Sequence, residues 1–207
     1  MADTLPINFP LPSESAVASY DWIDITDGTG YKTFYAAACA TSAATLYFLT
    51  KNPIDSGPIY LTVAGAGNTE QDFDSLFNRP ATIEGEAILS MTIGKSAGAA
   101  STGYVDVYFI RVDTAAAEHA IANIRTETVS QNAAGPNYAR ITTKLTIPQT
   151  HFAIGEKLRI TLKLTTAGAA TNYYLYIDPS ARASFTDDNG FAASSDLPIY
   201  VPFKVEL

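Results

Sequence analysis

Apolar and polar residues alternate along much of this chain. Successive side chains of a β-strand point to opposite faces, so an apolar residue at every second position indicates a strand with one buried face. Five segments carry this period clearly: 83–93, 105–109, 141–147, 158–164 and 199–207. Their intervening positions hold polar residues such as Glu84, Lys144 and Lys163. We therefore expect half-buried antiparallel strands in all five segments.

Less regular strands are expected at 17–25, 31–38, 45–50, 58–63, 119–129 and 172–177. The connections between strands are rich in Gly, Pro, Ser, Asn and Asp, as turn geometry requires. One short helix is predicted at 70–77, where Phe73, Leu76 and Phe77 recur at helical spacing. Segment 119–125 is also compatible with a helix, because the alanines at 115–117 beside it suit one.

About ten strands at this spacing predict an all-β fold, namely an antiparallel jelly-roll β-sandwich with one short helix. A length of 207 residues suits one such domain. We expect residues 1–14 to form an extended N-terminal arm and residues 15–207 to form the single domain. The prolines of the arm fix φ and remove amide donors, so the arm can form neither a helix nor a central strand.

The arm also carries apolar side chains that should not remain in water. Burying one such side chain is worth roughly 1.5–3 kcal/mol, so the arm should dock on its own domain or on a neighbouring subunit. These candidate interface residues are Leu5, Ile7, Phe9 and Leu11.

The charge balance argues against nucleic-acid and membrane partners. The chain has 13 Lys and Arg against 21 Asp and Glu, a net charge of −8. Neutralisation of phosphates by basic residues dominates affinity for nucleic acids, and anionic lipid likewise attracts basic segments. Neither a signal peptide nor a run of about 18 apolar residues is visible. The single cysteine, Cys39, forms no intramolecular disulfide, which fits synthesis in the reducing cytoplasm of a host cell.

Motifs that would indicate catalysis or cofactor binding are absent from the sequence. His119 and His151 have no further ligands at metal-binding spacing, and Cys39 has no neighbouring base. The Gly-Lys-Ser at 94–96 resembles the end of a phosphate-binding loop, but the position of its first glycine is Leu89. We therefore predict no catalytic residues and no cofactor.

Two carboxylate patterns are better explained by structure than by chemistry. The oxygen-rich loops at 21–28 and 187–190 could hold a calcium ion, but Asx-turns explain both without a metal. Glu84 and Glu86 share one strand face, as a catalytic pair would, yet exposed charges on a strand are far more common. We therefore expect no metal site, and a protein that is not an enzyme.

Tyrosines form the second set of interface candidates. A strand at 172–177 would turn Tyr174 and Tyr176 to one face, and a strand at 105–109 would place Tyr104 and Tyr108 beside Asp106. Exposed tyrosine near Asp or Asn suits a protein interface or sugar stacking, and cross-strand packing explains it equally.

The order of these strands resembles a jelly-roll β-sandwich of the galactose-binding-like type. The resemblance rests on the glycine-introduced strand at 83–86, the strand at 105–109, the run at 145–148, the aromatic Phe152 and the run at 155–160. It covers the central half of the chain and assigns no functional residue. In its length and its richness in small and aromatic residues, the chain is similar to virion structural proteins, including capsid decoration proteins.

The resemblance implies a structural protein located in the virion. Its expected partners are copies of itself and other virion proteins, with no nucleic acid and no membrane. The alternative is a carbohydrate-binding module, which would bind a glycan through its exposed tyrosines.

Overall fold

The computed structural model describes residues 29–40, 42, 44–54, 58–96, 98–131, 136–170, 172–186 and 192–204. Within these ranges the chain forms fourteen strands and no helix, so no helix there could cross a membrane. The strands are β1 (Thr29–Ala40), β2 (Thr45–Thr50), β3 (Tyr60–Ala64), β4 (Gly67–Leu76), β5 (Ala81–Lys95), β6 (Gly98–Val112), β7 (Glu118–Arg125), β8 (Val129–Gln131), β9 (Asn137–Phe152), β10 (Lys157–Ala170), β11 (Asn172–Tyr176), β12 (Ser184–Thr186), β13 (Ala192–Ser194) and β14 (Pro198–Lys204).

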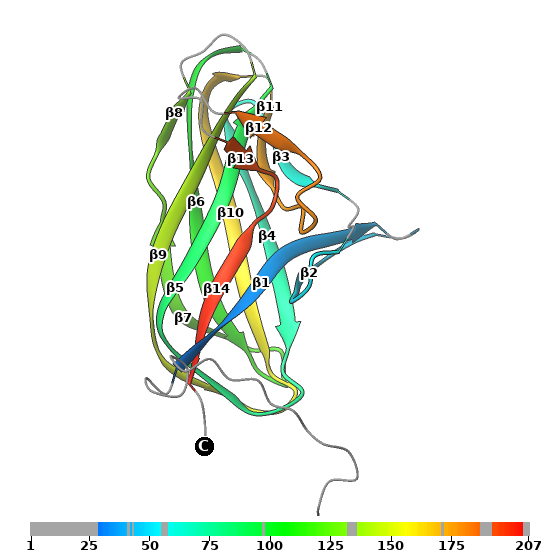
Figure 1. Ribbon diagram of the computed structural model, residues 1–207, viewed down its shortest axis with the longest axis vertical. Helices are drawn as coiled ribbons and strands as arrows, with labels where there is room; N and C mark the ends of the chain where they lie inside the picture. The colour runs from blue at the N-terminus through cyan, green and yellow to red at the C-terminus, as the bar shows by residue number, and fades with distance from the viewer. Residues whose placement is uncertain are drawn as a thin grey trace, which may run out of the picture.

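Twelve of these strands join in one mixed sheet, which curves into two facing layers (Figure 1). The front layer contains β9, β5, β14 and β1, with β11 and β3 beside the upper half of β5. The back layer contains β4, β10, β6 and β7, and β8 pairs with β6. The β1–β2 hairpin connects the layers through one parallel pairing of Phe48 with Asp74, and β12 pairs with β13 in a separate small sheet.

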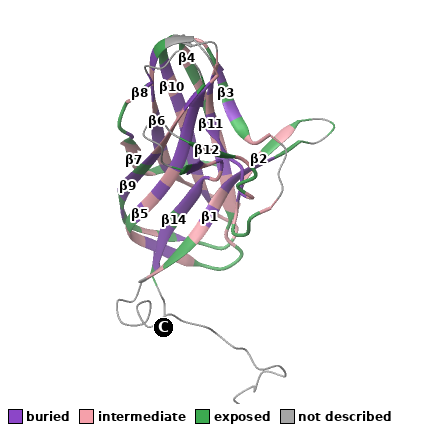
Figure 2. Cartoon of the chain, turned by 45° about the horizontal axis from the view of Figure 1, so that its top comes forward, coloured by how far each residue is buried: buried purple, intermediate pink, exposed green. Residues whose placement is uncertain are grey.

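The core lies between the two layers and follows the period-two pattern. On β10, the fully buried residues are Leu158, Ile160, Leu162 and Leu164. The residues between them, Arg159, Thr161 and Lys163, lie on the opposite face of the strand. Figure 2 shows buried residues along the strands of both layers. Buried positions of the other long strands include Val105, Val107, Phe109, Ala87, Leu89, Met91, Ile93, Leu145, Ile147, Ile199 and Val201.

The all-β prediction is confirmed, and so are most of the predicted strands. The strands expected at 31–38, 45–50, 58–63 and 172–177 correspond to β1, β2, β3 and β11. The ambiguous segment 119–125 is the strand β7. The strand expected at 17–25 and the arm expected at 1–14 lie outside the described residues.

The short helix predicted at 70–77 is wrong, because residues 70–76 lie in β4 and pair with β10. Phe73 is fully buried, whereas Leu76 is 55% exposed, so the two do not share a buried helical face. Asp72 and Asp74 flank Phe73 and turn outward to bond Thr161 and Arg159 of β10. Long-range pairing with β10 thus overrides a weak local helical signal.

Candidate functional site on the outer face of the back layer

The outward side chains of the back layer form a polar sheet face. The antiparallel register places Asp106 of β6 opposite Arg125 of β7, and Tyr108 opposite Asn123. On the other side of β6, the register places Asp106 opposite Lys163 of β10. The polar sheet face consists of Glu70, Asp72 and Asp74 on β4, Lys157, Arg159, Thr161 and Lys163 on β10, Tyr104, Asp106 and Tyr108 on β6, and Asn123 and Arg125 on β7.

An ion pair organises the β6–β7 part of this face. Arg125 donates through Nε and Nη2 to the two carboxylate oxygens of Asp106, at 2.7 and 3.2 Å. Its guanidinium also lies 4.2 Å from the centre of the Tyr104 ring. The hydrogen bond with Asp106 is the main cause that raises the pKa of Arg125 above its ordinary value. The guanidinium is therefore held in one position between a carboxylate and an aromatic ring.

Tyr108 borders two shallow hollows on this face. The first has a volume of about 420 Å³ and is lined by Asp106, Tyr108, Asn123, Ile124 and Arg125. The second, of about 230 Å³, is lined by residues 108–110 of β6 and residues 120–123 of β7. It lies where the pairing of β6 with β7 shifts register after Phe109. Tyr108 is half-buried, so part of its ring remains available to a partner beside fixed polar groups.

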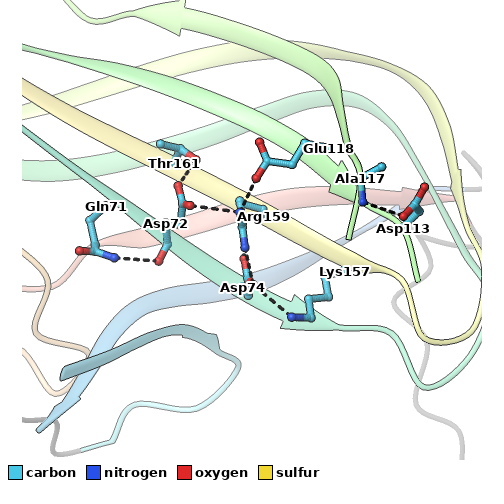
Figure 3. A network of polar contacts seen from close by, with 9 residues as sticks. All are labelled: Gln71, Asp72, Asp74, Asp113, Ala117, Glu118, Lys157, Arg159 and Thr161. Atoms are coloured by element: carbon cyan, nitrogen blue, oxygen red, sulfur yellow. Dashed lines mark hydrogen bonds and ion pairs between the residues drawn. The ribbon is translucent and has the colours of Figure 1, made fainter. Parts of the chain in front are cut away.

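The β4–β10 part of the face is a network of ion pairs centred on Arg159 (Figure 3). Arg159 contacts Asp74 at 2.7 Å, Asp72 at 3.1 Å and also Glu118 of β7. Burial alone would raise the pKa of Asp74, but hydrogen bonds and charges from Arg159 and Lys157 outweigh it and lower that pKa. These carboxylates are engaged in holding three strands together, which leaves the β6–β7 part as the candidate contact surface.

The tyrosines of β11 lie on the other layer and form an aromatic cluster. Tyr176 lies 4.6 Å from Phe185 and 6.3 Å from Tyr138 between ring centres, and Tyr60 lies 4.8 Å from Tyr174. Burial, and then the neighbouring tyrosines, raise the pKa of Tyr176 above its ordinary value.

The expectation that Tyr176 is exposed does not hold, because only 6% of its surface is accessible. The β12–β13 hairpin supplies Phe185, which packs on Tyr176. Tyr174 remains half-buried and lies on the same face, as its position in the strand predicted.

Of the interface candidates, Tyr104 and Tyr108 lie together on β6, while Tyr174 and Tyr176 lie apart from them on β11. Leu5, Ile7, Phe9 and Leu11 lie outside the described residues. Sequence reasoning missed Arg125 and Asn123, because segment 119–125 was not assigned firmly to a strand. A strand register that places opposite charges across a β6–β7 hairpin would have paired Asp106 with Arg125.

No protein-family model matches the sequence, and no curated protein is significantly similar to it. Solved structures, in contrast, share its fold. The chain is similar to a CocE/NonD family hydrolase from Staphylococcus aureus, with 10% identity and a TM-score of 0.50 over 84% of this chain and 37% of that chain. It is also similar to an aminopeptidase from a marine sediment archaeon, Thaumarchaeota archaeon, with 7% identity and a TM-score of 0.51 over 86% of this chain and 37% of that one.

A further match is to the structure of infectious bursal disease virus Gx strain, with 8% identity over 81% of this chain and 42% of that chain. Its TM-score of 0.28 is too low to support an argument about fold or function. The chain spans 37% of the length of each of the two hydrolases above, and identities of 7–10% show a shared fold alone.

The prediction that this protein is not an enzyme is contradicted by the comparison with hydrolases. That prediction rested on missing motifs and on a fold interpreted as non-catalytic. The same fold occurs within hydrolase chains, so it gives no ground for excluding an activity. Motif searches also miss catalytic groups that only the tertiary structure brings together.

Proposed function

We propose that this chain is an interaction module that joins a larger protein assembly through the β6–β7 part of its polar sheet face. The observation that carries the proposal is the half-buried Tyr108 beside the Asp106–Arg125 pair, above a shallow hollow. Tyrosine and arginine are the residues most enriched at the energetic centres of protein interfaces. An arginine already fixed by a carboxylate and a ring loses little conformational entropy when a partner binds.

The larger assembly in this proposal is a virion, with the chain as a capsid or decoration subunit of jelly-roll type. Support comes from the length of the chain and its richness in small and aromatic residues, which are similar to those of such proteins. An all-β fold with two layers agrees with this proposal. The partners are copies of the chain and other virion proteins, and residues 1–14 add an apolar arm that docks on a neighbour.

The test is the solution mass of the full chain and of two matched variants, measured by size exclusion with light scattering. Tyr108→Ala should weaken self-association or attachment about tenfold or more, as loss of a central interface residue does. The control, Tyr200→Ala, removes a 38% exposed tyrosine from the outer side of the front layer and should leave association unchanged. Association that survives Tyr108→Ala but is lost in Tyr200→Ala would place the interface on the front layer and contradict the proposal.

A second candidate is carbohydrate binding at the same hollow. One ring face, a carboxylate, an amide and a guanidinium converge there in Tyr108, Asp106, Asn123 and Arg125, which suits the hydroxyl groups of a sugar. A monomeric chain that binds a glycan array, and loses this binding in Tyr108→Ala and Asn123→Ala, would favour this candidate over assembly.

A further inference from the structure

A separate hollow of about 280 Å³ lies at the end of the molecule where β4 ends and β5 begins, the lower end in Figure 1. Four parts of the chain meet there: the start of β1, the residue after β2, the β4–β5 turn and the end of β14. The hollow is lined by Lys32, Phe34, Lys51, Ser75, Leu76, Phe77, Asn78, Arg79, Pro80, Ala81 and Phe203.

Aromatic rings form the apolar side of this hollow. Phe34 and Phe203 are 1% and 4% exposed, and their ring centres lie 6.2 Å apart. Phe77, which follows β4, packs against Phe203 at 6.0 Å and against Phe152 at 4.6 Å. These rings are anchored in the core, so this wall of the hollow is preformed.

Three basic side chains, Lys32, Lys51 and Arg79, form the polar side together with Ser75 and Asn78. The Lys32 ammonium lies 3.9 Å from the centre of the Phe203 ring, which holds it over the apolar wall. Burial, and then the nearby charge of Lys51, lower the pKa of Lys32. Positive charge is thus concentrated here, and no carboxylate of the described residues pairs with it.

In the described part of the chain, these three residues differ from the other basic residues because they contact neither a carboxylate nor a main-chain carbonyl. The chain has 13 Lys and Arg in total. Those that pair with carboxylates are Arg125, Arg140, Lys144, Lys157, Arg159, Lys163, Arg182 and Lys204. Lys95 and Arg111 donate to main-chain carbonyls of Gln131 and His151. Each of the remaining three lines this one hollow, and none pairs with a carboxylate in the described part of the chain.

We propose that this hollow binds a small oxyanion ligand, a carboxylate or phosphate carried on a compact apolar group. Lysine and arginine are the usual binders of both anions, and an anion between Lys32 and Lys51 would relieve their mutual repulsion. The volume, at the low end for ligand sites, limits the ligand to a small molecule. The aromatic wall of the hollow would contact the apolar group of the ligand. The hollow shares no lining residue with the two hollows beside Tyr108, so its ligand is independent of the proposed interface.

The proposal is tested by calorimetric titration of the full chain with phenyl phosphate, benzoate and inorganic phosphate, at an ionic strength kept constant with sodium chloride. Phenyl phosphate or benzoate should bind with one-to-one saturation, and whichever binds more tightly identifies the anion. Removing the phenyl group should weaken phosphate binding about fivefold or more, because the apolar contact is lost.

Lys51→Gln and Arg79→Gln lie outside the strands and should each weaken binding about tenfold, the effect of losing one charge-assisted hydrogen bond. Lys163→Gln, which removes the same charge from the polar sheet face, is the control and should bind as the unmodified chain does. The site would be overturned if injecting phenyl phosphate or benzoate released no more heat than injecting sodium chloride. It would also be overturned if Lys51→Gln, Arg79→Gln and Lys163→Gln all bound the ligand with equal affinity. Equal affinity for phenyl phosphate and inorganic phosphate would contradict the proposal that the ligand carries an apolar group.

Discussion

Replacing Arg159 with Met should destabilise the protein at neutral pH, and less so in acid. The substitution keeps most of the apolar stem of Arg159 but removes the charge that contacts Asp72, Asp74 and Glu118. Three carboxylates from two strands would then face one another, with only Lys157 left as a cation beside Asp74. Their repulsion, added to the lost hydrogen bonds, acts against the pairing of β4 with β10 and against the contact of Arg159 with β7.

The size of the expected loss in stability follows from how exposed the Arg159–Asp74 ion pair is. Exposed ion pairs contribute about 0–1 kcal/mol, whereas breaking a buried one costs about 3–5 kcal/mol. The side chains of Arg159 and Asp74 are 20% and 24% exposed, between these limits. We therefore expect Arg159→Met to lower the free energy of unfolding by about 2–3 kcal/mol at pH 7. For a chain of this size that corresponds to a fall in Tm of about 5–10 °C.

The pH dependence has a definite sign. The pKa of Asp74 in the folded protein lies below its ordinary value. Its contribution to stability is therefore full above the unfolded pKa of about 3.9 and is lost as the pH falls through the folded pKa. In Arg159→Met the part of this contribution that comes from Arg159 is absent at every pH, while the part from Lys157 remains. The difference between the two proteins should accordingly shrink as the pH falls from 7 to 3.

Urea unfolding followed by circular dichroism at pH 7 and pH 3 measures both effects. Lys163→Met is a matched control on the same strand, because Lys163 lies 3.5 Å from Glu70, whose side chain is 53% exposed. The free energy of unfolding of this control should fall by less than about 1 kcal/mol. A loss for Arg159→Met no larger than the control, or equal losses at both pH values, would refute the electrostatic account of this network.

Three further predictions follow from packing and from the arm. Gly94→Ala would place a Cβ 2.8 Å from the Tyr138 ring, which is itself stacked on Phe185 at 4.2 Å. Urea unfolding should therefore show a loss of about 1–3 kcal/mol in the free energy of unfolding. Unchanged stability would mean that the Tyr138 ring moves freely. Phe73→Ala empties a fully buried position and should cost about 3–5 kcal/mol by the same assay, whereas a loss under about 1 kcal/mol would contradict the core assignment. Deleting residues 1–12 should leave Tm nearly unchanged but reduce self-association; a much lower Tm with normal association would place the arm on its own domain.

The comparison with hydrolases changes how the candidate site is interpreted. The two structures with TM-scores of 0.50 and 0.51 show that this fold occurs within longer hydrolase chains. The β6–β7 part of the polar sheet face is the candidate contact surface in either setting. Measuring the association of Tyr108→Ala therefore informs on the interface whether the partner is a second copy or a different domain.

The candidate site was only half accessible to sequence reasoning. The alternation at 105–109 predicted that Asp106 and Tyr108 share the outer face, because strand geometry alone decides this. Arg125 was missed because its position depends on the register of β7 against β6, including the shift after Phe109. Likewise, the strand pattern predicted that Tyr174 and Tyr176 share a face, but not that Phe185 packs on Tyr176.

What the sequence by itself determined is the alternation of its strands. The run at 158–164 predicts β10 because the period of two is a local property of an extended backbone, and the buried residues Leu158 to Leu164 follow it. The tertiary structure decided whatever depends on distant partners. Segment 70–77 became a strand because β10 pairs with it, and Lys32, Lys51 and Arg79 meet because three separate parts of the chain end at one hollow. Local pattern fixes which face a side chain takes, whereas long-range register fixes which side chains it meets.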